Sequence, residues 1–248
     1  MLRLDNVTKS YAKTTAVDSI NLEIKPGETT VLIGPSGCGK STILRLMIGL
    51  IKPDTGMVYF ADQELTRDNI RAARLRMGYV IQDGGLFPHL TARDNIMIMS
   101  KYLGWHKKKT DERLSELTAL SQFPETGLDR YPVQLSGGQR QRVSLMRSLM
   151  LDPDILLLDE PLGALDPMIR SDLQEDLRSI FKKLNKTVVM VTHDMGEAGF
   201  FGDTIVLLRK GEIIQTGSFQ ELFTSPSDPF VTRFINAQRS PLEKIQKL

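Results

Sequence analysis

The chain lacks the features that would tie it to an oxidising compartment, a membrane or nucleic acid. Its 248 residues include a single cysteine, Cys38, and one cysteine cannot form an internal disulfide. No segment reaches the roughly 18 consecutive apolar residues of a membrane-spanning helix, and the start, with Asp5 close behind Met1, does not resemble a secretory signal. The net charge is only +2, whereas polyanion-binding proteins usually carry a large basic excess. We therefore expect a cytoplasmic chain without a nucleic-acid partner.

Strand and helix patterns alternate along the chain without internal repeats. The expected strands cover residues 2–7, 16–24, 29–33, 57–60, 155–158, 187–191, 204–208 and 212–216, and the expected helices cover 42–47, 91–122, 138–151 and 167–184. A basic bend at residues 105–109 divides the long helical segment, and Lys210-Gly211 indicates a hairpin. This alternation predicts an α/β fold with a mainly parallel sheet.

The segment 34–42 fits the phosphate-loop pattern G-x-x-x-x-G-K-[ST], with a strand pattern before it and a helix pattern after it. Glycines let backbone N–H groups point at phosphate oxygens, and the helix N-terminus adds its positive dipole end. We expect Lys40 to reach the β- and γ-phosphates and Ser41 to bind Mg²⁺. The expected nucleotide-binding residues are Gly34, Pro35, Ser36, Gly37, Cys38, Gly39, Lys40, Ser41 and Thr42. For Cys38 the alternatives are a redox switch and a small tolerated residue, and the second is the favoured interpretation.

Two carboxylates, Asp159 and Glu160, directly follow the apolar segment 155–158. A buried strand places its terminal acid at the sheet edge, near the phosphate loop of a neighbouring strand. Asp159 is expected to hold Mg²⁺, and Glu160 to polarise or deprotonate the attacking water. Alone, the pair also fits an ordinary strand end. Together with the phosphate loop upstream, it predicts a P-loop NTPase.

The segment 135–139, Leu-Ser-Gly-Gly-Gln, resembles the signature of ABC transporter ATPases. The chain order is similar too: phosphate loop, Gln82, signature, Asp159-Glu160, Ala164-Leu165-Asp166, then His193. The resemblance covers nearly all of residues 1–220 and implies the ABC ATPase fold, with a P-loop core, an N-terminal antiparallel β subdomain and an inserted helical lobe. It implies a single domain over 1–240, with the core at about 1–90 and 150–220, the lobe at about 91–149, and a short helical tail at 219–248 without a regulatory domain.

The signature residues begin a helix, so they predict a second anion site in the same chain. In the family, each ATP is clamped between the phosphate loop of one subunit and the signature of another, in a two-fold dimer. The resemblance therefore implies ATP and Mg²⁺ as cofactors and a second ATPase subunit, in a homodimer, as a partner. The residues that would act across the dimer are Ser136, Gly137, Gly138 and Gln139.

Further roles follow from the resemblance alone. Tyr11 resembles the aromatic residue that stacks on adenine, and a surface tyrosine near a strand end is the alternative. Gln82 resembles the glutamine that senses Mg²⁺ and the γ-phosphate, His193 the switch histidine that contacts the γ-phosphate, and Asp166 the acid that communicates across the dimer. The implied catalytic residues are Lys40, Gln82, Glu160 and His193, and the implied metal ligands are Ser41, Gln82 and Asp159.

The chain departs from the family pattern in two places. Ser144, Met146 and Ser148 stand where the family often has alanine, which we expect to alter helix packing and not chemistry. Gly199-Phe200-Phe201 replaces a leucine-containing stretch, which puts the local helix geometry there in doubt.

The segment 77–91 resembles importers of glycine betaine, choline and carnitine, in particular through Ile81 and the run 85–89. This implies a subunit on the cytoplasmic face of the membrane, partnered by permease subunits and indirectly by a solute-binding protein. An importer for an amino acid or polyamine, a soluble ABC ATPase acting on DNA or the ribosome, and a nucleotide-dependent switch are the alternatives. A permease helix is expected to contact residues 83–105, unless these only pack the helical lobe. The expected contacts are Leu86, Phe87, Leu90, Met97, Met99 and Tyr102.

Overall fold

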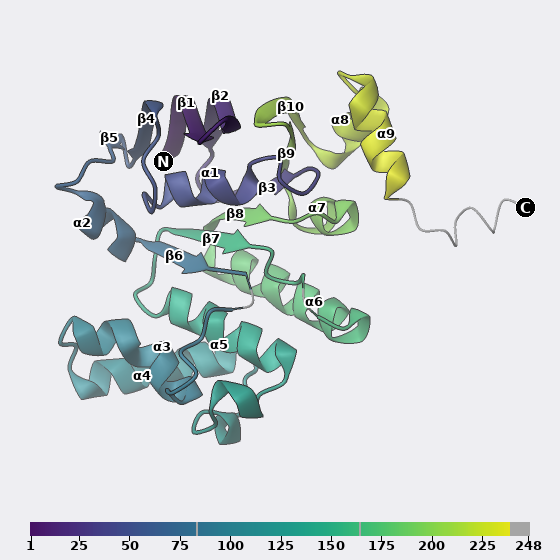
Figure 1. Ribbon diagram of the computed structural model, residues 1–248. Coiled ribbons are helices and arrows are strands. Elements are labelled where there is room, and N and C mark those ends of the chain that lie inside the picture. Colours follow the sequence, from purple (N-terminus) through teal and green to yellow (C-terminus); the bar gives the residue numbers. More distant parts are fainter. Residues whose placement is uncertain (83, 164, 239–248) are drawn as a thin grey trace, which may run out of the picture. The chain divides into compact units, whose positions relative to one another are not determined.

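The computed structural model describes residues 1–82, 84–163 and 165–238, shown in Figure 1. Asp83, Ala164 and the tail residues 239–248 lie outside the described residues. The chain forms two compact units. The first joins Met1–Leu65 to the segment that begins at Val189, and the second comprises Thr66–Val188. The domain boundaries expected from the family pattern stay a prediction.

The first unit contains an antiparallel sheet with strand order β2-β1-β4-β5. Its strands are β1 (Leu2–Tyr11), β2 (Thr14–Ile24), β4 (Thr55–Phe60) and β5 (Gln63–Glu64). Alternation along β1 buries Leu2 and Leu4, as period-two side-chain geometry requires. Val7 is also buried, because the register is irregular between Leu4 and Val7 and shifts the alternation by one residue. The antiparallel β subdomain implied by the family pattern is thus confirmed. β1 runs to Tyr11 and not to residue 7 because its polar second half still pairs with β2.

A second set of strands follows the order β10-β9-β3-β8, and it lies in this unit except for the first two residues of β8. β3 (Thr29–Ile33) is buried throughout and runs parallel to β9 (Thr204–Arg209), while β10 (Glu212–Gly217) returns antiparallel to β9. The predicted hairpin is confirmed, because Lys210 and Gly211 have φ of 50° and 87° and two left-handed residues form the tight turn that joins such strands. β8 (Thr187–Val191) matches the expected boundaries.

The described part of the first unit also contains four helices: α1 (Lys40–Met47), α7 (Met195–Phe201), α8 (Phe219–Thr224) and α9 (Pro229–Ala237). α1 contacts β1 and β2, and α7 contacts β3. The departure from the family pattern at Gly199 still forms a helix. A side chain there would lie 2.8 Å from the Phe219 ring, so glycine lets α8 approach α7 closely.

The second unit contains two parallel strands, β6 (Met77–Val80) and β7 (Ile155–Asp159). Its helices are α2 (Ile70–Leu75), α3 (Ala92–Tyr102), α4 (Lys107–Leu120), α5 (Gly137–Leu149) and α6 (Pro167–Leu184), with 3-10 turns at Glu125–Gly127 and Pro132–Gln134. α5 is the centre of this unit, since it contacts α3, α4, α6 and β6. Gly78 allows the approach of β6, because a Cβ there would lie 2.7 Å from the Ser148 carbonyl oxygen.

A further sequence-based expectation is wrong in detail. The bend predicted at residues 105–109 is shorter, because Lys107–Lys109 form the first turn of α4. Lysine is a good helix former, and the Lys109 amine lies 3.8 Å from the centre of the Trp105 ring. The sequence pattern also does not predict β6, α2 or α7, which are short.

Among the described helices, none combines the length and the apolar character that crossing a bilayer demands.

Candidate functional site

The phosphate loop joins the buried strand β3 to α1. Three of its glycines, Gly34, Gly37 and Gly39, have φ of 151°, 75° and 109°, values that residues with a side chain rarely adopt. A Cβ at Gly34 would lie 2.3 Å from the Leu208 carbonyl oxygen, and one at Gly39 would lie 2.3 Å from that of Ala16. The loop therefore needs glycine for its curvature and also for space. Such curled backbone presents N–H groups that suit an anion.

Lys40 is enclosed by the loop that precedes it. Its side chain is 6% exposed, and Nζ donates hydrogen bonds to the carbonyls of Gly34 (2.8 Å) and Pro35 (3.0 Å). A buried amine needs such partners, because an unpaired buried charge is costly. The ammonium group is thus held inside the loop.

Cys38 has the character of a buried structural residue. Its side chain is 3% exposed, and burial raises the pKa of the thiol although the Lys40 amine lies 3.7 Å away. The reactive form of cysteine is the thiolate, so this environment disfavours a redox switch. The backbone of Cys38 is also engaged, since its carbonyl accepts from the Gly211 N–H at 3.1 Å.

Tyr11 and His193 lie in the same unit as the phosphate loop. Tyr11 is 46% exposed and pairs with Thr14 of β2, two residues before Ala16, whose carbonyl contacts the loop. His193 is exposed and directly follows Thr192, whose N–H donates to the Leu32 carbonyl of β3 at 3.2 Å. Both residues are therefore close in the fold to strands that support the phosphate loop.

The segment around His193 is held by side chains. Thr192 Oγ1 donates to Glu197 Oε2 and accepts from the Asp194 N–H at 3.1 Å. The Asp194 carboxylate caps α7 by accepting from the N–H groups of Gly196 (2.7 Å) and Glu197 (3.1 Å). The Gln238 amide donates to the His193 carbonyl and accepts from the Met195 N–H. Gln238 is 45 residues away in sequence, and no local pattern predicts its role.

The second unit places the two carboxylates where β7 ends. Asp159, the last residue of β7, is 4% exposed, and Glu160 is half-buried with φ of 47°. The Glu160 carbonyl accepts from the Gly163 N–H at 3.2 Å, which closes a turn. Asp159 and Glu160 therefore lie at the carboxyl end of β7, as the sequence predicts, and the turn begins directly after the strand.

The signature residues form the N-terminus of α5. Ser136 is the N-cap: its Oγ accepts from the Gln139 N–H (3.2 Å), while Gln139 Oε1 accepts from the Ser136 N–H (3.0 Å). This reciprocal capping box leaves the first-turn N–H groups of Gly137 and Gly138 without helical partners. A side chain at Gly138 would lie 2.8 Å from Ile169 Cγ2. A hollow of about 240 Å³ opens here, lined by Gln122, Pro124, Ser136, Gly138, Gln139, Arg142, Ile169, Asp172 and Leu173.

Gln82 is an exposed turn residue just beyond β6. The loop that follows it is fastened to α5 by two side chains. Ser144 Oγ donates to the Gly84 carbonyl at 2.7 Å, and the Arg147 guanidinium donates to the carbonyls of Gly84 and Gly85, both at 2.9 Å. Burial lowers the pKa of Arg147. The departure at Ser144 thus adds a tie between the signature helix and the Gln82 loop, beyond the change in helix packing expected from sequence.

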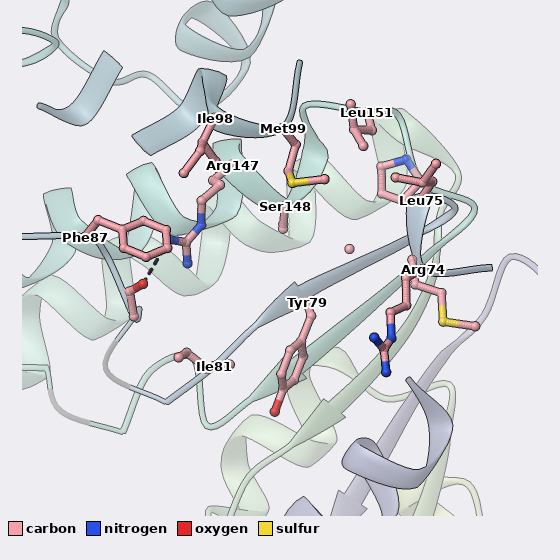
Figure 2. Close-up of a pocket in the computed structure, with 14 residues that line it drawn as sticks. Arg74, Leu75, Tyr79, Ile81, Phe87, Ile98, Met99, Arg147, Ser148 and Leu151 are labelled. Atoms are coloured by element: carbon pink, nitrogen blue, oxygen red, sulfur yellow. Dashed lines mark hydrogen bonds between the residues drawn. The ribbon is translucent and has the colours of Figure 1, made fainter. Parts of the chain in front are cut away.

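An apolar groove of about 420 Å³ runs beside this loop. Figure 2 shows Arg147 reaching from α5 toward Phe87, with Met99 and Ile98 nearby, and the guanidinium lies 5.9 Å from the centre of the Phe87 ring. The groove is lined by Arg74, Leu75, Met77, Gly78, Tyr79, Ile81, Gly85, Phe87, Ile98, Met99, Arg147, Ser148, Leu151 and Pro153. Of the six residues expected to contact a permease, Phe87 and Met99 line it, whereas Met97 is buried at 7% exposure.

We compared the chain with known protein families and with curated proteins. A family model described as ABC transporter matches residues 17–163. The chain is 44% identical over 240 residues to the glycine betaine/carnitine/choline transport ATP-binding protein OpuCA of Bacillus subtilis (strain 168). The aligned region covers 96% of this chain and 63% of that protein. It is 46% identical over 235 residues to the probable sulfate/thiosulfate import ATP-binding protein CysA of Chlorella vulgaris, which covers 94% of this chain and 97% of that protein.

The fold is similar to the dimeric post-hydrolysis structure of the ATP-binding cassette MJ0796 bound to ADP and Pi. The TM-score is 0.79 at 36% identity, over 88% of this chain and 99% of that chain. The fold class and the resemblance to the betaine, choline and carnitine group are thereby confirmed. The chain spans only 60% to 64% of the length of the relatives named OpuCA, OpuBA and OsmV.

Proposed function

Because this chain belongs to the ABC transporter family, we propose that it is the ATP-hydrolysing subunit of an importer for betaine-type, quaternary-ammonium solutes. The observation that carries the ATPase part is the phosphate loop, with its left-handed glycines around the buried Lys40. Relatives named for glycine betaine, carnitine and choline transport support the solute class. The relative named for sulfate and thiosulfate import, at 46% identity, favours an importer of another small solute as the second candidate.

The chemistry of the residues suits a nucleotide with Mg²⁺. The loop backbone and the Lys40 amine would hold the β- and γ-phosphates, and the exposed Tyr11 ring would stack on adenine. Ser41 and Asp159 offer a hydroxyl and a carboxylate, the hard oxygen ligands that Mg²⁺ prefers, and Gln82 adds an amide oxygen. When bound, the ion would neutralise charge that develops on the transferred phosphoryl group.

Two residues are assigned to hydrolysis itself. Glu160, at the exit of β7, would accept a proton from the attacking water as a general base. His193 would donate a hydrogen bond to the γ-phosphate and so report whether it is present. The remaining groups orient the nucleotide, because phosphoryl transfer depends mainly on positioning and electrostatic stabilisation.

The proposed site is completed by a second copy of the chain. In the signature, the side chains of Ser136 and Gln139 each accept a hydrogen bond from the other residue's N–H. The first-turn N–H groups of Gly137 and Gly138 therefore point outward from the helix end and are proposed to bind an anion. The MJ0796 relative is described as a dimer with ADP and Pi. Asp166, the N-cap of α6, is the residue proposed to carry information between the two copies.

We assign the groove lined by Phe87 and Met99 to a permease helix, which would place the subunit on the cytoplasmic face of the membrane. Met99→Glu is expected to weaken co-purification with the permease by about 30-fold in affinity, because a charge in an apolar groove removes a central contact. Nucleotide affinity should stay unchanged. The matched control is Val133→Glu, since Val133 is 88% exposed and is not part of the groove lining. Equal permease binding by both variants would contradict the assignment.

Uptake measurements test the proposed function directly. Cells that lack their own osmoprotectant and sulfate importers would express this chain with its permease and solute-binding protein, and labelled glycine betaine and sulfate would be supplied separately. We expect ATP-dependent betaine uptake, and none when Glu160 is replaced by glutamine. Uptake of sulfate alone would establish the second candidate. An absence of ATP hydrolysis by the wild-type complex would overturn the ATPase assignment.

A further inference from the structure

The C-terminal end of α9 lies beside α7 (Figure 1), and its Gln238 is hydrogen-bonded to the segment that contains His193. Gln238, the C-cap of α9, spans this segment with both atoms of its side-chain amide. Its Oε1 accepts from the Met195 N–H at 2.7 Å, and its Nε2 donates to the His193 carbonyl at 2.7 Å. One side chain thus bridges the peptide groups on both sides of Asp194, 43 and 45 residues away in sequence.

The helix that supplies Gln238 is itself fixed. Val231 is 0% exposed and Ile235 is 7% exposed, so one face of α9 is buried in its own unit. Asp228 caps the helix by accepting from the Phe230 N–H at 2.6 Å, and the Arg209 guanidinium lies 4.6 Å from the centre of the Phe230 ring. The Gln238 amide is therefore presented from a rigid element, as a positioning group requires.

Gln238 accepts a hydrogen bond from an N–H group that has no acceptor within α7. Met195 is the first residue of α7, and the N–H of a first-turn residue has no partner inside the helix. The Asp194 carboxylate takes the next two N–H groups, those of Gly196 and Glu197, and Gln238 takes that of Met195. Its second hydrogen bond fixes the carbonyl of His193, and this sets the backbone from which the imidazole projects.

We propose that Gln238 is a positioning residue that holds His193 in its working orientation, a role that rests on the proposed ATPase function. The C-terminal helix α9 then contributes to phosphate sensing although none of its residues is assigned to nucleotide binding. Gln238 acts only through the His193 and Met195 peptide groups. Its loss should lower the rate of the chemical step and leave the nucleotide-binding loop unchanged.

The experiment compares the full-length wild-type chain with Gln238→Ala. We expect kcat for ATP hydrolysis to fall about tenfold with KM for ATP unchanged, the size expected when a supporting hydrogen bond to a functional group is removed. Selective ¹⁵N-methionine labelling gives a direct readout, because the chain has only 11 methionines and Met195→Leu identifies the signal. Hydrogen exchange of the Met195 amide should accelerate about tenfold, since it loses its hydrogen bond to Gln238.

Two further variants serve as a matched control and as a test of the two hydrogen bonds separately. Gln215 makes the same kind of amide bridge elsewhere in this unit, accepting from the Ser227 N–H (2.8 Å) and donating to the Ser225 carbonyl (3.1 Å). Gln215→Ala is therefore the matched control and should leave kcat and Met195 exchange unchanged. Gln238→Glu keeps an acceptor for Met195 but cannot donate to the His193 carbonyl at neutral pH. It should preserve Met195 protection yet still lower kcat.

The outcomes separate this role from the proposed function. An active wild-type chain together with an unchanged kcat in Gln238→Ala would overturn the positioning role alone. Equal losses of kcat in Gln238→Ala and Gln215→Ala, with matching falls in melting temperature, would also overturn it, because they would indicate general destabilisation. A wild-type complex that does not hydrolyse ATP would overturn the proposed function.

Discussion

Replacing Glu160 by glutamine is expected to lower ATP turnover at least about 100-fold, the contribution of a positioned general base, while ATP still binds. Glutamine keeps the length and the acceptor oxygen of glutamate but cannot take a proton from water at neutral pH. The backbone at Glu160 has a φ of 47°, which both residues tolerate at similar cost. Steady-state phosphate release and nucleotide titration, measured on the same preparation, give the two quantities.

The same variant should accumulate an ATP-bound dimer. If hydrolysis normally reopens the pair, blocking it leaves nucleotide bridging the phosphate loop of one copy and Ser136–Gly138 of the other. Light scattering with and without ATP would detect the dimer. Glu175→Gln makes the same change of charge at an exposed position on α6 of the same unit and should behave as wild type. A normal hydrolysis rate in Glu160→Gln would show that another group activates the water.

Elements with strong local signals were predictable from sequence. The boundaries of β3, β8 and α6 agree with expectation because each is marked by local chemistry. β3 is an apolar run between a Pro-Gly turn and a glycine loop, and α6 begins with Pro167 behind the Asp166 N-cap. The curvature of the phosphate loop was equally predictable, since the glycine spacing itself encodes it.

Contacts between residues distant in sequence were not predictable. Nothing near Gln238 indicates that its amide meets the segment at His193, and nothing near Gly84 indicates the donors Ser144 and Arg147. Such contacts depend on how helices pack, and a periodic pattern shows which face is buried but not what it meets. The start of α4 was missed for a related reason. A run of lysines suggests a solvated bend. In the structure the run begins α4, and the Lys109 amine lies over the face of the Trp105 ring, where the ring attracts the positive charge.

Removing the Lys40 amine should have the second large effect, on nucleotide binding itself. Lys40→Ala is expected to raise Kd for ATP about 100-fold, equivalent to about 2.7 kcal/mol, because a charge-assisted contact to phosphate is lost. The substitution also removes the hydrogen bonds to the Gly34 and Pro35 carbonyls, so the loop loses an internal brace. Isothermal titration with ATP and with ADP measures the change, and the loss should be larger for ATP because the amine is proposed to reach the γ-phosphate.

Two comparisons isolate the contribution of the amine. Lys186 is the matched control, since its amine also has a defined partner, Asp152 at 2.9 Å, in the other unit. Lys186→Ala should reduce stability while nucleotide affinity stays at the wild-type value. Lys40→Arg keeps the charge, but a planar fork cannot replace a compact ammonium in a position that is 6% exposed, so affinity should remain low. Unchanged ATP affinity in Lys40→Ala would contradict the phosphate-loop assignment, and full recovery in Lys40→Arg would show that charge alone binds the nucleotide.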